Sequence, residues 1–119
     1  MSSALKASQS LQLLHDVSLG FALECRPDGA PDFTLRQLTV LLTVYLEPPP
    51  HTVRGLAAKL DVTKPVITRA LDSLGKIGLV SRRRDPADGR NVIVQRTVKG
   101  ALYVESIGDL VIRKMQALR

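Results

Sequence analysis

The sequence predicts a single, mainly α-helical domain of the α+β class that carries one small β-hairpin. Three observations lead to this prediction. The chain has 119 residues, which is the size of one domain. Apolar residues recur at three- and four-residue steps in several segments, the pattern of amphipathic helices. Two short segments flank an Asp-Gly turn at Asp88-Gly89, the pattern of a hairpin.

The first two helices are predicted from apolar periodicity and from residues that stop a helix. The first runs from Ser3 to about Cys25 and is followed by a loop at 26–32, which is rich in Pro and Gly. The second begins after Thr34, a good N-cap with Gln37 three residues later. It stops at three consecutive prolines, 48–50, because prolines lack backbone N–H groups.

Two further helices follow with only a short turn between them. Thr52 is expected to cap a helix that reaches Leu60, and Thr63 is expected to cap the next, about 64–77. Pro65 is tolerated because the amides of a first turn have no partners within the helix. Gly78 provides the C-terminal stop.

The hairpin and a last helix complete the chain. Its strands are predicted at 79–84 and 91–96. Thr97 is expected to cap the last helix, whose apolar stripe continues to Leu118. The first and last helices carry more apolar surface than a small core needs, so part of it is expected to meet a second subunit.

This order of elements is that of a winged helix-turn-helix. Its second helix enters the major groove of DNA by its N-terminal residues, and its hairpin, the wing, can reach the neighbouring minor groove. We therefore expect a DNA-binding region over 34–97. Residues 1–33, a helix and loop, and 98–119, the C-terminal helix, are expected to form the dimer interface.

Charge supports a polyanionic partner. The net charge is +6, and residues 51–100 hold eleven basic and four acidic side chains. Aromatic residues make up only 3% of the chain, which argues against stacking on single strands and favours duplex DNA. The candidate DNA-contacting residues lie on the second helix of the pair and on the hairpin: Thr63, Lys64, Pro65, Thr68, Arg69, Ser73, Lys76, Arg82, Arg84, Asp88 and Arg90.

From Thr34 to Gly100 the sequence resembles the MarR-type winged-helix transcriptional regulators. The segments 52–60 and 62–74 are similar to the two helices of that family's helix-turn-helix, and 79–90 is similar to its strand and wing. The most specific likeness is the spacing of Asp88, Arg90, Thr97 and Gly100. Arg96 departs from the pattern, since the family usually has an apolar residue there.

The resemblance implies a homodimer that binds a pseudo-palindromic operator in double-stranded DNA and often represses nearby genes. It implies that Arg90 contacts the minor groove and that Asp88 orients the wing. It also implies that the residues facing the major groove are Lys64, Pro65, Thr68 and Arg69. Many members are released by phenolic or other small aromatic ligands, so an effector is expected near Phe21, Tyr45 or Tyr103. Some respond to thiol oxidation, which draws attention to Cys25, although a packed cysteine at a helix end is the expectation favoured here.

Other functions find little support in the sequence. It has no nucleophile with its base, no phosphate-binding glycine loop and no metal-ligand cluster around His15 or His51, so neither an enzyme, a cofactor nor a metal is expected. It has no transmembrane run or signal peptide, and a cytoplasmic protein is expected. The alternative that remains is a winged-helix module that binds a protein partner and has weak or architectural DNA affinity.

Overall fold

The computed structural model describes residues 4–25 and 32–119. These fall into two compact units. Unit 2 is Phe33–Val104, and unit 1 joins the N-terminal segment up to Asp32 to Glu105–Arg119. The expected loop at 26–32 lies outside the described residues except for Asp32, and so do the first three residues of the chain, which include the expected start of the N-terminal helix.

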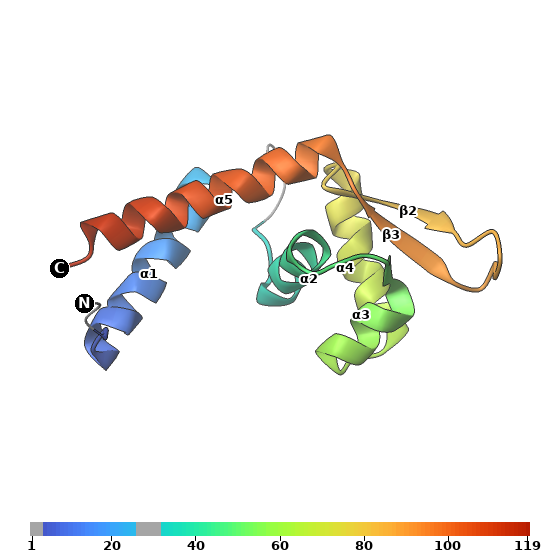
Figure 1. Cartoon of the computed structure of the whole chain (residues 1–119), viewed down its shortest axis with the longest axis horizontal. Helices are drawn as coiled ribbons and strands as arrows, with labels where there is room; N and C mark the ends of the chain where they lie inside the picture. Colours follow the sequence, from blue (N-terminus) through green and yellow to red (C-terminus); the bar gives the residue numbers. More distant parts are fainter. Residues whose placement is uncertain (1–3, 26–31) are drawn as a thin grey trace. The chain divides into compact units, whose positions relative to one another are not determined.

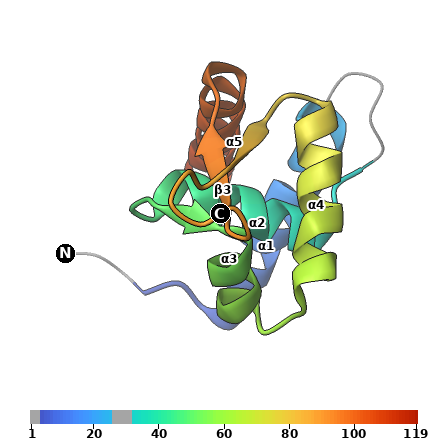
Figure 2. The same ribbon diagram turned by 90° about the vertical axis from the view of Figure 1, so that its right-hand side faces the viewer.

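Unit 2 contains three helices and a small sheet (Figures 1 and 2). The helices are α2 (Leu35–Leu46), α3 (Val53–Leu60) and α4 (Lys64–Lys76). The strands are β1 (His51–Thr52), β2 (Val80–Arg84) and β3 (Val92–Arg96). The last helix, α5 (Val98–Ala117), begins in this unit. The predicted mainly α-helical fold with a β-hairpin is confirmed.

The sheet has one strand more than the sequence predicts. Its order is β1-β3-β2 with antiparallel pairs, and β2 and β3 form the predicted hairpin with Val80 opposite Arg96 and Arg84 opposite Val92. The additional strand pairs His51 with Val94. A two-residue strand has no periodicity to read, so only the tertiary structure reveals it.

One continuous apolar core holds unit 2 together. Leu41 of α2, Leu71 of α4 and Ile67 of α4 are fully buried at its centre. Each apolar side chain of this size contributes about 1.5 to 3 kcal/mol when it is buried. The other buried members come from the three helices, from β2 and the residue before it, and from β3: Val40, Val44, Val53, Leu56, Ala57, Ala70, Leu74, Leu79, Val80 and Val94.

Helix ends follow the sequence signals with one exception. Thr34 and Gln37 form the predicted capping box, and the Thr52 hydroxyl accepts a hydrogen bond from the Gly55 N–H at 2.9 Å. Gly78 has φ +76°, a left-handed conformation that glycine adopts without strain. Thr63 occupies the predicted N-cap position of α4. The prediction that its side chain caps the helix was wrong, because the hydroxyl makes no capping hydrogen bond.

The start of α5 is fixed to unit 2 by Tyr45. The Tyr45 hydroxyl donates to the Leu79 carbonyl oxygen at 2.6 Å and accepts from the Thr97 N–H at 3.0 Å. The Thr97 hydroxyl donates to the Gly78 carbonyl oxygen at 2.7 Å and caps α5 by accepting from the Gly100 N–H at 2.9 Å, as the sequence predicts. These bonds tie α2, the start of β2 and the start of α5 to one another.

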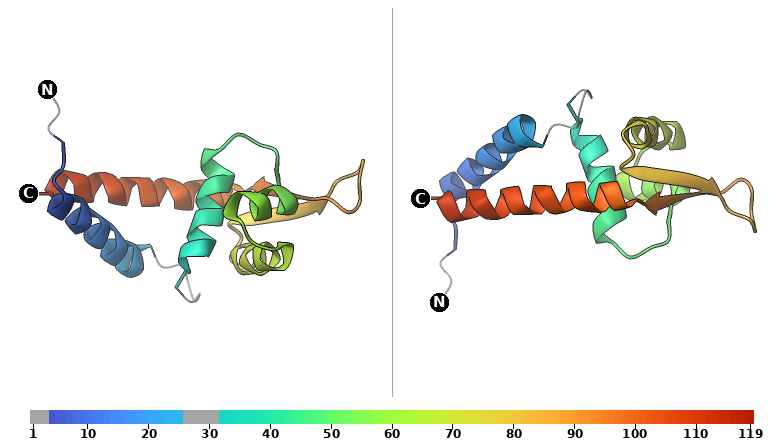
Figure 3. Two further views of the ribbon diagram at one scale, coloured as in Figure 1. Left: turned by 90° about the horizontal axis from the view of Figure 1, so that it is seen from below. Right: turned by 90° about the horizontal axis from the view of Figure 1, so that it is seen from above.

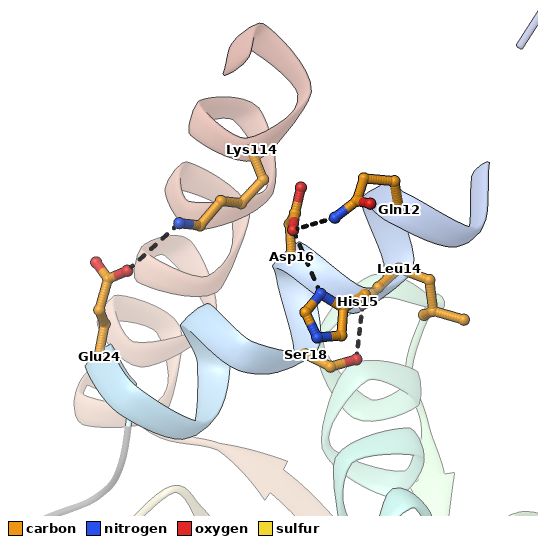
Figure 4. Close-up of polar contacts among 7 residues, drawn as sticks. All are labelled: Gln12, Leu14, His15, Asp16, Ser18, Glu24 and Lys114. Atoms are coloured by element: carbon orange, nitrogen blue, oxygen red, sulfur yellow. Dashed lines mark hydrogen bonds and ion pairs between the residues drawn. The ribbon is translucent and has the colours of Figure 1, made fainter. Parts of the chain in front are cut away.

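Unit 1 is built from α1 (Ala7–Glu24) and the second part of α5. Gly20 lets the helices approach closely, because a Cβ at this position would lie 2.7 Å from Leu110 Cδ1. At the end of α1, Glu24 faces Lys114 at 4.0 Å, while Asp16 lies between Gln12 and His15 on the α1 surface (Figure 4). Glu24 also accepts from Arg113 Nη2 at 2.9 Å.

Candidate nucleic-acid interface

The candidate interface begins with the turn between α3 and α4. Asp61 adopts the left-handed conformation, with φ 55° and ψ 50°, at the C-cap of α3. The Val62 N–H then donates to the Ala57 carbonyl oxygen at 3.0 Å, which closes the end of the helix. Aspartate tolerates this conformation better than most residues. The tight turn directs the chain straight into α4, as a helix-turn-helix requires.

One side of α4 is buried and the other presents polar side chains. Ile67, Ala70, Leu71 and Leu74 pack into the core. Lys64, Pro65, Thr68, Arg69 and Lys76, all predicted DNA contacts, are exposed, while Ser73 is half-buried and its hydroxyl donates to the Arg69 carbonyl oxygen at 3.3 Å. The buried stripe fixes which face the helix turns outward, so the exposed set lies on one polar side of α4, with three basic side chains, Lys64, Arg69 and Lys76, and the acidic Asp72.

The hairpin places Arg90 at its end. The loop between β2 and β3 extends past α3 and α4 of the same unit (Figure 3). The Arg90 side chain is 92% exposed. Asp88 accepts a hydrogen bond from the Arg90 backbone N–H at 3.1 Å and lies 3.7 Å from Arg90 Nε. An extended loop with an exposed guanidinium has the shape and charge that a narrow minor groove accepts.

The loop is held by Asp85. Its carboxylate accepts hydrogen bonds from the Ala87 N–H at 2.9 Å and from the Asn91 side chain at 3.3 Å. The Ala87 hydrogen bond is the main reason that the pKa of the Asp85 carboxyl lies below its usual value. The Arg84 guanidinium adds a bond across the loop, donating to the Gly89 carbonyl oxygen at 2.6 Å.

Two of the predicted arginines are therefore engaged within the protein. Arg84 binds the hairpin loop, and Arg82 Nη2 lies 2.7 Å from Asp72 Oδ1 on α4. Arg83, between them, lines a separate hollow with Pro50 and His51. Successive side chains of a strand point to opposite faces, so Arg83 is separated from its two neighbours along β2.

The three candidate effector residues divide between the units. Phe21 belongs to unit 1, whereas Tyr45 and Tyr103 belong to unit 2. The Tyr45 hydroxyl is occupied by the bonds to Leu79 and Thr97, and the Tyr103 ring meets Phe33 edge-on with centroids 5.9 Å apart. One hollow of unit 2, of about 670 Å³, lies elsewhere, between the start of α2 and α4, and Arg36 and Arg69 are among its lining residues.

Cys25 is the residue on which a response to thiol oxidation would depend. Cys25 is buried, and this burial raises the pKa of its thiol, which keeps the less reactive protonated form dominant at neutral pH.

Residues 4–25 and 32–119 contain no group of three or more His, Cys, Asp or Glu side chains placed to hold a metal ion. In the same ranges no helix has the length and apolar character needed to cross a membrane.

Sequence reasoning missed the roles of Asp72 and Arg96. Asp72 is the only acidic residue of α4, and its pairing with Arg82 depends on a strand ten residues later. Arg96 Nε donates to the Val44 carbonyl oxygen at 2.7 Å and its Nη2 to the Glu47 carbonyl oxygen at 2.8 Å. The only signal in the sequence was that Arg96 stands where the resembled family usually has an apolar residue. That signal did not identify the carbonyl groups that Arg96 binds.

Comparison with known proteins identifies the family. A family model described as the MarR family matches residues 33–92, which span α2 through the start of β3 and include the helix-turn-helix and the hairpin loop. The chain belongs to the MarR family. Members of the MarR family are transcriptional regulators, not enzymes.

Two relatives of this chain are named as helix-turn-helix transcriptional regulators. An uncharacterized HTH-type transcriptional regulator of Mycobacterium leprae is 37% identical over 73 residues, covering 61% of this chain and 50% of the relative. The uncharacterized HTH-type regulator YdgJ of Bacillus subtilis is 35% identical over 66 residues, covering 56% of this chain and 40% of the relative. The alignments thus span half or less of each relative's length.

Solved MarR-type structures share the fold. The crystal structure of MarR is 27% identical with a TM-score of 0.67, over 97% of this chain and 80% of that chain. A point mutant of S. aureus MepR bound to an oligodeoxyribonucleotide is 20% identical with a TM-score of 0.77, over 96% of this chain and 82% of that chain. These neighbours confirm the winged helix-turn-helix.

Proposed function

We propose that this chain is a sequence-specific, double-stranded-DNA-binding transcriptional regulator that acts as a dimeric repressor in the cytoplasm. The observation that carries the proposal is the joint exposure of a basic α4 surface and of Arg90 at the hairpin loop within one unit. Solved neighbours with the same fold are described as bound to DNA, namely AbfR and the MepR mutant. Both observations favour the same kind of ligand.

In this proposal α4 reads the major groove. Thr63 and Lys64 lie at its start, where backbone N–H groups without helical partners attract a phosphate, while Pro65 beside them has no N–H to donate. Arginine, lysine and hydroxyl side chains donate to base edges and phosphates, which is the chemistry required of Thr68, Arg69, Ser73 and Lys76. Arg90 then enters the adjacent minor groove while Asp88 holds the backbone before it.

The dimer is proposed to form through α1 and the end of α5. Several large apolar side chains of these helices are exposed in the single chain, including Leu11 at 67%, Leu23 at 72% and Met115 at 57%. Monomers rarely leave so many apolar side chains in water on one pair of helices. A two-fold dimer would present two α4 helices to half-sites about one helical turn apart.

The proposal also includes release of the protein from DNA by a small aromatic ligand. Phe21, Tyr45 and Tyr103 stay the candidate contacts, and PcaV of Streptomyces coelicolor, a neighbour of the same fold, is described in complex with its natural ligand. Because the Tyr45 hydroxyl is already bonded twice, an aromatic ligand would have to contact the partly buried ring instead. A panel of phenolic carboxylates, titrated into the protein–DNA complex, tests release.

The test of DNA binding is selection from a random duplex library followed by fluorescence anisotropy. The enriched duplex should bind about a thousandfold or more tightly than a scrambled duplex of equal composition. Binding should weaken steeply as salt rises, since phosphate contacts release counterions. If no sequence is enriched, the proposal is wrong and a protein-binding winged helix becomes the better interpretation.

A further inference from the structure

The contact between Arg82 and Asp72 joins the hairpin to α4. Arg82 Nη2 lies 2.7 Å from Asp72 Oδ1, close enough for a charge-assisted hydrogen bond. The pair is not buried: the side chains are 31% and 54% exposed, respectively. An exposed pair of this kind adds little stability, because water screens the charges. Its position on the surface is therefore of more interest than its energy.

Asp72 lies in the middle of the surface proposed to face DNA. In an α-helix residues four apart lie on the same side, so Lys64, Thr68, Asp72 and Lys76 form one row along α4. Asp72 is the one acidic residue of the helix. A carboxylate in this row repels phosphates, and it also binds an arginine that would otherwise attract them.

Arg82 has room to move if it is released. A hollow of about 640 Å³ opens beside the pair, and its lining includes Asp72, Lys76 and Arg82 itself. Arginine keeps its charge at any pH of interest and binds phosphate readily. Without Asp72, its guanidinium would thus be a mobile cation beside the α4 row.

We propose that Asp72 is a specificity-determining residue, which holds Arg82 away from the DNA backbone and so limits sequence-independent binding. This inference rests on the proposed function and concerns how the same surface discriminates between duplexes. Phosphate contacts carry no sequence information, whereas base contacts distinguish sequences and fix the position of α4 on the selected duplex. On a scrambled duplex α4 is not fixed in this way, so it can shift until a released Arg82 meets a phosphate. One cation fewer available to phosphate therefore weakens non-specific binding more than specific binding.

The experiment compares four forms of the 119-residue chain: wild type, Asp72→Asn, Arg82→Gln and the double variant. Each is titrated by anisotropy against the selected duplex and the scrambled duplex over a salt series. Circular dichroism melting verifies that each variant is folded, and Arg82→Met serves as a second variant if the Gln form is not. Glu47→Gln, which removes an exposed carboxylate paired with Lys59 outside α4 and the hairpin, controls for a general change of net charge.

The expected result is specific to the Asp72→Asn form. Its binding to the scrambled duplex tightens by roughly three- to tenfold at low salt, and its slope of log affinity against log salt steepens by about one, the effect of one additional phosphate contact. Its ratio of specific to non-specific affinity falls. In the double variant the slope returns to the wild-type value, because the released cation is absent. Glu47→Gln leaves the slope unchanged.

Two results would overturn the inference while the proposed function stands. One is an Asp72→Asn form with the wild-type slope and the wild-type affinity for the scrambled duplex. The other is an equal effect of Asp72→Asn with and without Arg82, which would mean that the carboxylate only repels DNA directly. A wild-type chain that selects no duplex at all would instead reject the proposed function, and this inference with it.

Discussion

Arg96 Nε donates a hydrogen bond to the Val44 carbonyl oxygen at 2.7 Å, and thereby ties β3 to the last turn of α2. The last carbonyl groups of a helix have no partners within it, and cations near this end are favoured by the helix dipole. The same guanidinium also binds the Glu47 carbonyl oxygen and lies 5.9 Å from the centre of the Tyr45 ring. A charged residue at this position therefore performs a structural role that an apolar residue could not.

Replacement of Arg96 by Met should lower the free energy of unfolding by about 1 to 3 kcal/mol, since hydrogen bonds to charged groups contribute on this scale. Urea denaturation followed by circular dichroism measures the change. Arg54→Met, at an exposed position of α3, is the control and should change stability by less than about 0.5 kcal/mol. Equal effects of the two substitutions would mean that the Arg96 hydrogen bonds add no stability.

Gly100 and Gly108 lie on the same helix but should respond oppositely to alanine. A Cβ at Gly100 would collide with the Tyr45 hydroxyl and the Leu79 carbonyl oxygen, while among the described residues nothing lies within 4 Å of a Cβ at Gly108. Gly100→Ala should destabilise the chain by about 1 to 3 kcal/mol through forced repacking. Gly108→Ala should raise stability by up to about 1 kcal/mol, because alanine favours a helix more than glycine does. Thermal melting of both variants tests the contrast.

The proposed dimer interface predicts a change of assembly on charging α1. Leu23→Glu should shift the protein toward monomer in sedimentation equilibrium, because a carboxylate cannot be buried in an apolar interface without a partner. Leu46→Glu on α2 is a close control, since Leu46 is 71% exposed and Leu23 is 72% exposed. If Leu46→Glu dissociates the dimer and Leu23→Glu does not, the interface lies on unit 2 instead.

The hairpin loop should contribute to operator binding through Arg90. Arg90→Ala is expected to weaken binding to the selected duplex by roughly 1 to 3 kcal/mol. The melting temperature should stay nearly constant, because the side chain is 92% exposed. Anisotropy measures the affinity, with Arg36→Ala on α2 as a control for loss of one positive charge. An Arg90→Ala form with wild-type affinity would remove the minor-groove role of the hairpin.

The order of the hairpin loop should depend on pH through Asp85. The pKa of this carboxyl is lowered, chiefly by the Ala87 N–H, so its ionised form is favoured in the folded chain. The stabilising effect is present above the unfolded-state pKa and is lost as pH falls through the lower folded-state pKa. The Ala87 amide resonance should therefore shift as pH is lowered below about 4. Asp85→Ala should abolish this shift; its persistence would assign the titration to another group.

Local signals in the sequence predicted most helix and strand positions. The Thr34-Gln37 pair, the left-handed Gly78 and the Asp-Gly turn each depend on residues close in sequence, so their chemistry can be read there. The capping hydrogen bond expected of Thr63 could not be predicted in this way. Its residue type suits a cap, but whether its hydroxyl reaches a backbone N–H depends on a side-chain rotamer that the local sequence does not fix.

The surface proposed to bind DNA was predictable in part for the same reason. The α4 stripe of Ile67, Leu71 and Leu74 must face the core, so periodicity alone identifies the exposed basic side. It could not show that Arg82 and Arg84 are already engaged, because their partners are an acid on another element and a carbonyl across the loop. Such pairings are set by the distance between elements after packing.

The sequence by itself determined the α+β class, the helix-turn-helix, the hairpin and the charge of the α4 surface, because each follows from periodicity, turn residues and composition over short stretches. The tertiary structure alone decided the third strand at His51, the Arg96 bonds to α2, the Tyr45 junction and the pairing of Asp72 with Arg82. These contacts join residues brought together only when the core closes. Hydrogen-bond geometry between distant segments is a property of the packed chain, not of any local stretch.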